Sequence, residues 1–235
     1  RPAPATVAGV RSISPADFHF PMAPTRERSA DKGTIAIAFV QEALAELARR
    51  GLAVDALVAA AGISPELLNA PQARVSSAHY GRLWHLIAEA TDDEFFGMDS
   101  HPMKAGSFTL LCHSVIHCDT LERALRRALR FFRLVLDDFE GVLERSGDTA
   151  RVVLRERHAA PRRAFAYGTF LIILHGLACW LVGRRIPLDT ARFRCAEPDF
   201  SAEWRVLFSP DLRFDEAETA IVFSAEYLDM ANVQN

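Results

Sequence analysis

Apolar residues recur at helical spacing from Thr34 onward. Ile37, Val40 and Leu44 fall three or four positions apart, which places them on one face of a helix. Thr34 is a suitable N-cap for this helix, and Gly51 is a suitable residue to end it. Similar spacing predicts further helices over residues 55–61, 65–68, 77–90 and 106–117.

The next helix has the clearest pattern. Asp119 and Glu122 are three residues apart, as in a capping box, so we expect a helix to open here and run to about residue 136. Its apolar face consists of Leu121, Leu125, Ala128, Phe132 and Val135.

Short strand-like runs dominate after residue 138. Residues 139–145 and 150–156 are joined by Ser-Gly-Asp, which predicts a hairpin. Further strands are predicted over 192–196, 212–214 and 220–223, with a short helix over 203–208. Because helices come first and strands late, we predict an α+β fold, a mostly helical domain with a small antiparallel sheet contributed by the C-terminal half.

A long helix is predicted between these runs, from about residue 162 to 182. Its residues 165–182 contain no Asp, Glu, Lys or Arg, which approaches the length of a membrane span. Tyr167, Thr169 and His175 interrupt the apolar run, and basic pairs flank both ends. We therefore favour a helix in the protein core and expect no membrane partner. Tyr167 and His175 would then face either a core partner or a ligand cavity.

The ends of the chain lack such periodicity. Residues 1–33 are rich in Pro, Ala, Ser and Arg and are predicted to form a flexible tail, in which Met22 is a possible natural start. The folded domain is predicted to span residues 34–230. The chain shows no secretory signal, and four cysteines without CxxC spacing are typical of reduced thiols in the cytoplasm.

Charge is unevenly distributed along the chain. The net charge is −3, so the chain lacks the basic footprint of a DNA-binding domain. Residues 121–136 carry five arginines and one glutamate, whereas residues 186–235 carry ten acidic and four basic side chains. These are either two solvated faces or surfaces that pair, within or between subunits. Our candidates for dimerisation are Arg126, Arg127, Arg130 and Arg133.

Catalytic and cofactor motifs are absent from the sequence. It contains no GxSxG, P-loop, GxGxxG or HExxH pattern, so we expect neither an enzyme nor a cofactor. His113 and His117 have the i, i+4 spacing of two metal ligands, but two ligands make a weak site. We favour histidines that line a ligand pocket over a metal site. An enzyme acting on a small acid or ester through His113, His117 or His175 is a less favoured alternative.

Two predicted helix starts combine free backbone N–H groups with a nearby cation. One follows Lys104 and includes Ser107, and the other follows Arg162 and Arg163. Such a site suits a carboxylate or phosphate, although ordinary capping and surface charge explain each pair as well.

Several segments, in order, resemble the arabinose-binding-like N-terminal domain of AraC-type transcription regulators. The resemblance runs from about residue 33 to 230. The segments are GIS…R-V…FFG within 51–98, KAGSFTLLCHSVIHCDTLERALRRALRFFRLVLDDF, the hairpin VLERSGDTARVVLRE, and the closing IVFSAEYLD.

This resemblance implies a domain that binds an effector and forms a homodimer. In such regulators a short linker leads to a DNA-binding domain of two helix-turn-helix motifs, and residues 231–235 would be the start of that linker. DNA would then be bound only through that absent domain. A dimerisation module without ligand is an alternative.

The composition does not favour a sugar effector. Sugar sites use Trp and Tyr stacking, and the chain has only three of each. The phenylalanines Phe131, Phe132, Phe165 and Phe170 instead suggest an apolar cavity for a small molecule with an anionic group. The predicted ligand-binding residues are Lys104, Ser107, His113, His117, Arg162, Tyr167 and His175.

Overall fold

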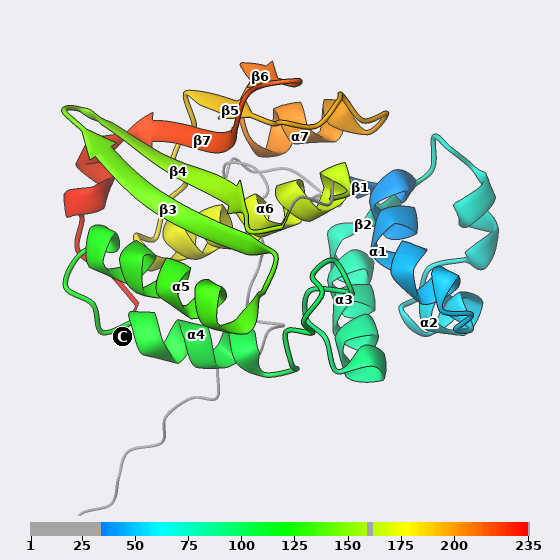
Figure 1. Ribbon diagram of the computed structural model, residues 1–235. Helices are drawn as coiled ribbons and strands as arrows, with labels where there is room; N and C mark the ends of the chain where they lie inside the picture. Colours follow the sequence, from blue (N-terminus) through cyan, green and yellow to red (C-terminus); the bar gives the residue numbers. More distant parts are fainter. Residues whose placement is uncertain (1–33, 159–161, 235) are drawn as a thin grey trace, which may run out of the picture.

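The computed structural model describes residues 34–158 and 162–234 and shows an α+β fold, as predicted (Figure 1). A helical part built from α1, α2 and α3 lies beside a five-stranded sheet, and helices α6, α5 and α4 lie beneath the sheet. The predicted N-terminal tail and Met22 lie outside the described residues.

The helices follow the predicted order. Two 3-10 helices supplement them at Pro65–Asn69 (η2) and Ala225–Asp229 (η3). The α-helices are α1 Ile37–Arg49, α2 Val54–Ala60, α3 Ser77–Thr91, α4 Ser107–Val115, α5 Leu121–Val135, α6 Ala164–Leu181 and α7 Ser201–Leu207.

The strands form two sheets. The larger has the order β3-β4-β7-β5-β6, and every neighbouring pair is antiparallel except β5 and β6, which are parallel. The smaller sheet pairs β1 with β2. The strands are β1 Thr34–Ala36, β2 Arg74–Ser76, β3 Phe139–Ser146, β4 Thr149–Glu156, β5 Thr190–Arg192, β6 Leu212–Arg213 and β7 Thr219–Ser224.

Two of the predicted helix caps are wrong. Thr34 does not cap α1, because it lies in β1 and pairs with Ser76, which is distant in the chain. The cap of α5 is Thr120, whose hydroxyl accepts a hydrogen bond from the Arg123 amide. Asp119 instead forms an ion pair with the Arg123 side chain. Thr120 therefore caps α5 in place of the predicted N-cap, Asp119.

The central strands show the alternation expected of a half-covered sheet. In β4, Val152 and Leu154 are buried against the helices, whereas Arg151 and Arg155 lie on the other face. Arg151 pairs there with Glu144 and Glu218. One face of the sheet is thus part of the core, and the other is a polar surface.

Helix α6 is the central core helix. It is long and apolar enough to cross a membrane, but 83% of its residues are buried inside the protein. An apolar surface on all sides is what a helix requires when a sheet and other helices cover it. At Gly168 the absent side chain leaves room for Trp204, because an added Cβ would lie 2.4 Å from Cζ2 of that ring.

Candidate effector site

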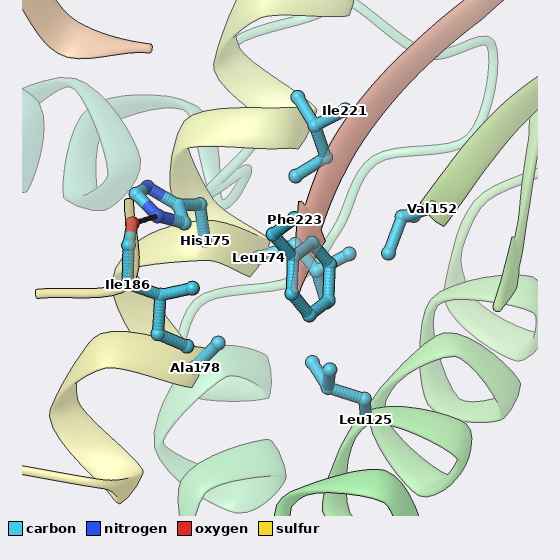
Figure 2. Close-up of a pocket in the computed structure, with 8 residues that line it drawn as sticks. All are labelled: Leu125, Val152, Leu174, His175, Ala178, Ile186, Ile221 and Phe223. Carbon is cyan, nitrogen blue, oxygen red and sulfur yellow. Dashed lines mark hydrogen bonds between the residues drawn. The ribbon is translucent and has the colours of Figure 1, made fainter. Parts of the chain in front are cut away.

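A small apolar cavity lies between the inner face of the sheet and helices α5 and α6 (Figure 2). It leaves about 10 Å³ for the centre of a water molecule, which is roughly the space that one water occupies. Anything larger therefore requires the surrounding elements to move apart. The lining side chains are Leu125 of α5, Val152 of β4, Leu174, His175 and Ala178 of α6, Ile186 of the following loop, and Ile221 and Phe223 of β7.

His175 supplies the polar group of this lining. Its Nε2 lies 2.8 Å from the carbonyl oxygen of Ile186, as the dashed line in Figure 2 marks. Because a carbonyl only accepts, the proton of the neutral ring is on Nε2 and Nδ1 is an acceptor. Burial, with a smaller contribution from the nearby Arg185, lowers the pKa of His175 to about 4, against the effect of the Ile186 hydrogen bond. The ring is therefore neutral at pH 7.

Cys179 completes this arrangement one turn further along α6. Its Sγ lies 3.5 Å from His175 Nε2 and accepts a hydrogen bond from the Ile186 amide. Burial raises the pKa of this thiol, so the pair is a neutral thiol beside a neutral imidazole. An activated nucleophile requires a thiolate instead, so these two side chains have the character of core residues.

Of the seven predicted ligand-binding residues, His175 is the one that lines this cavity. Lys104 and Ser107 lie at the N-terminus of α4, where the protein supplies its own carboxylates. Glu94 accepts hydrogen bonds from the amides of Gly106 and Phe108, each at 2.7 Å. A ligand carboxylate there would have to displace Glu94.

The second carboxylate at this helix start comes from Asp92. It lies 3.5 Å from the Lys104 ammonium and accepts a hydrogen bond from the Ala105 amide. Burial raises the pKa of Glu94 despite its two amide donors. Glu94 and Asp92 thus bind the amides and the lysine that were expected to bind an anionic ligand.

His113 lies exposed on α4, and His117 lies exposed in the turn that follows. Within residues 34–158 and 162–234, no three His, Cys, Asp or Glu side chains are grouped so that they could hold a metal ion. The two histidines are also separated from the cavity, whose lining includes no residue of α4.

Arg162 and Tyr167 lie near the start of α6 and take part in internal polar contacts. Arg162 Nη2 is 2.6 Å from Oδ1 of Asp138, a carboxylate only 1% exposed. The Tyr167 hydroxyl donates to Glu156, whose other oxygen accepts from Arg194 at 3.1 Å. Tyr167 therefore joins α6 to β4, and Arg162 joins the segment before α6 to the residue before β3; neither side chain lines the cavity.

The candidate dimerisation arginines lie exposed on α5. Arg126 pairs with Glu122 at 2.7 Å, Arg133 lies 3.5 Å from Glu140, and Arg127 donates to the Ser114 carbonyl. Internal contacts with the acidic C-terminal third are made by other arginines, among them Arg145 of β3, which binds Asp229, and Arg151 of β4, which binds Glu218. Inside the subunit Arg126 and Arg133 thus pair with Glu122 and Glu140, and pairing of the α5 arginines between subunits stays a prediction.

The apolar lining of the cavity escaped the sequence analysis. Val152, Ile221 and Phe223 are ordinary inward-facing strand residues, and Leu125 is an ordinary core position of α5. The available signal was the alternation in the two strands, which marks the inner face but does not show where packing leaves a gap.

Comparison with known proteins defines the class. Residues 51–232 match the family described as the arabinose-binding domain of AraC transcription regulators, N-terminal. The chain belongs to this family, whose members serve transcription regulation. The sequence resemblance is confirmed.

Two individual proteins are similar to this chain. The chain is 25% identical over 201 residues to the ornithine utilization regulator of Pseudomonas aeruginosa, covering 83% of this chain and 58% of that protein. A crystal structure of the transcriptional regulator CdpR from Pseudomonas aeruginosa matches with 16% identity and a TM-score of 0.42, covering 83% of this chain and 58% of that one. The chain therefore spans somewhat more than half the length of these relatives.

Proposed function

We propose that residues 34–230 are the effector-sensing and dimerising domain of a cytoplasmic transcription regulator that binds DNA through a further domain. The cavity between the sheet, α5 and α6 carries the proposal, because it is an apolar space with a neutral polar anchor at His175. Family membership supports a regulatory role, and the acidic balance of the chain supports DNA binding by another part of the protein.

The proposed effector is a small, largely apolar molecule with an anionic group. The lining around His175 is apolar, which suits an aliphatic body. Arg185 follows α6 and directly precedes the lining residue Ile186, and its positive charge helps to lower the pKa of His175. Its guanidinium donates to the carbonyls of Val206 and Leu207 and is the cation that we assign to the effector's anionic group.

Thermal unfolding with a matched set of compounds tests this proposal. The set contains hexanoate, hexanamide, L-ornithine and L-arabinose, of which L-ornithine is chosen because of the relative named for its utilisation. A ligand at one hundred times its Kd stabilises by about 2.7 kcal/mol. For a domain of this size, that raises Tm by roughly 5–10 °C.

We expect a compound with a carboxylate, hexanoate or L-ornithine, to raise Tm. Hexanamide and L-arabinose should have little effect. Arg185→Gln should reduce the rise, whereas Arg213→Gln, which removes an exposed cation paired with Asp211 on β6, should leave it unchanged. Stabilisation by arabinose alone, or by no member of the set, would contradict the proposed effector class.

A dimerisation module without ligand is the second candidate, because the cavity is only about the size of one water molecule. We propose that dimer contacts involve the α5 arginines, near which Leu134 is 79% exposed. Sedimentation should then show a dimer that Arg127→Glu with Arg130→Glu dissociates. Arg82→Glu, at an exposed position on α3, is the control. A monomer at high concentration would refute the dimer under either candidate.

A further inference from the structure

The last described residues, 230–234, cross the ends of three helices, and we call this segment the C-terminal strap. Its hydrogen bonds join α4, α5 and α6 to one another through the strap. They run from Leu121 N to Met230 O at 2.9 Å, from Asn232 Nδ2 to Val115 O at 3.1 Å, from Val233 N to Leu181 O at 2.8 Å, and from Gln234 Nε2 to Trp180 O at 2.7 Å.

These partners explain why the strap binds at this place. Val115 ends α4, and Trp180 and Leu181 lie at the end of α6, so their carbonyls have no amide donor four residues further along their own helices. The strap donates to all three, and the carbonyls of Val115 and Trp180 also accept from the turn amides of Cys118 and Gly183. Gly183 allows it to come close, because a Cβ there would lie 2.8 Å from Cγ2 of Val233.

The strap is held with one polar group unsatisfied. Oδ1 of Asn232 is buried and has no hydrogen-bond partner among the described residues. An unsatisfied buried acceptor is unfavourable, which offsets part of what the four hydrogen bonds contribute. The docked strap is therefore less stable than its four hydrogen bonds alone would make it.

The cavity is enclosed by two of the helices that the strap joins. On α5, Leu125 lines the cavity one turn after Leu121, and on α6, Ala178 lines it one turn before Leu181. A molecule larger than water needs α5, α6 or the sheet to move outward, since packed interiors have little spare volume. Movement of α5 or α6 also displaces the points to which the strap is bonded.

We propose that cavity occupancy and strap docking exclude one another: an occupant larger than water releases residues 231–234, and the docked strap keeps the cavity closed. The nature of the occupant rests on the proposed function, but the coupling does not. In the longer regulator, release would free the linker that leads to the DNA-binding domain. Coupling between two sites is reciprocal, so loosening the strap must also loosen the cavity.

An enlarged side chain can stand in for the occupant. Ala178→Leu places an isopropyl group in the cavity, and we expect hydrogen exchange at the Val233 amide to accelerate about tenfold, equivalent to about 1.4 kcal/mol. The matched control is Ala43→Leu on α1, an alanine equally buried but outside the cavity lining. Exchange is compared by NMR at denaturant concentrations that equalise the global stability of the two variants.

The reverse experiment keeps the proposal testable even when Ala178→Leu fails to fold. Asn232→Ala with Gln234→Ala removes two strap hydrogen bonds, and we expect faster exchange at the amide of Ile186, a cavity-lining residue whose amide donates to Cys179. Exchange at the Met103 amide, bonded to Asp93 away from the strap, should not change.

Unchanged exchange at Val233 in the first variant, or at Ile186 in the second, would overturn the coupling. An equal increase in the control variant or at the control amide would do the same. Neither experiment uses a ligand, so a failure here is distinguishable from a failure of the effector panel.

Discussion

Replacing Gly168 by alanine should destabilise the protein, although alanine is normally the better helix former. An added Cβ would lie 2.4 Å from Cζ2 and 2.7 Å from Cε2 of Trp204. That ring is fully buried and stacked against Phe193 at a centroid distance of 4.4 Å, so it has little room to withdraw. Overpacking of this kind costs about 1–3 kcal/mol, whereas the gain in helix propensity is about 1 kcal/mol.

Gly81 of α3 provides the control, because it is exposed and a Cβ there would meet nothing within 4 Å. Gly81→Ala should stabilise the protein by up to about 1 kcal/mol. Gly168→Ala should lower the free energy of unfolding and Gly81→Ala should raise it. The two variants should therefore differ in stability by about 1–3 kcal/mol, or roughly 2–12 °C in Tm. Thermal unfolding followed by circular dichroism measures this difference. A Gly168→Ala protein as stable as Gly81→Ala would refute the packing argument.

Three further outcomes follow from buried charges. Burial lowers the pKa of His175 from 6.5 to about 4, so the neutral ring contributes stability that is present above pH 6.5 and is lost as pH falls toward 4. The loss amounts to at most about 3 kcal/mol. Urea titrations of His175→Gln should therefore show a smaller loss of stability over this pH window than the unchanged protein. Asp138→Ala should lower the free energy of unfolding by about 3–5 kcal/mol, because it leaves Arg162 unpaired beside the core. Arg123→Ala, which breaks an exposed ion pair, should lower it by less than about 1 kcal/mol. Equal losses for the two variants in chemical denaturation would contradict this prediction. Burial raises the pKa of Glu94 above its ordinary value of 4.5, so the stability that the protonated form contributes is lost as pH rises above 4.5. Glu94→Gln should abolish that part of the pH dependence, and an unaltered profile would contradict the assignment.

Local patterns predicted most elements because the relevant signals lie close together in the chain. The Ser-Gly-Asp turn joins β3 to β4 as expected, and the apolar face of α5 is buried from Leu121 to Phe132. The β1–β2 pair was missed because Thr34 and Ser76 are far apart in the chain, with α1 and α2 between them. A strand of three residues carries too little pattern to compete with the helical signal beside it.

The site was predicted less well, for a related reason. His175 was identified because a histidine inside an apolar helix is conspicuous. The partners that satisfy the other candidates are distant in sequence, as with Glu94 at the start of α4 and Asp138 beside Arg162. A free helix N-terminus and one already filled by the protein have the same local sequence.

Helix α1 extends the apolar core beyond the segment shared with the family. The family match begins at residue 51, after α1 has ended at Arg49. Yet Ile37, Phe39 and Val40 of α1 are buried, together with Ala43, Leu44 and Leu47. Removing α1 would expose to water the apolar surfaces that these side chains cover, which costs about 25 cal/mol per Å². A protein shortened to the family boundary should therefore be less stable than one that begins at β1, so the family boundary is a poor guide to truncation.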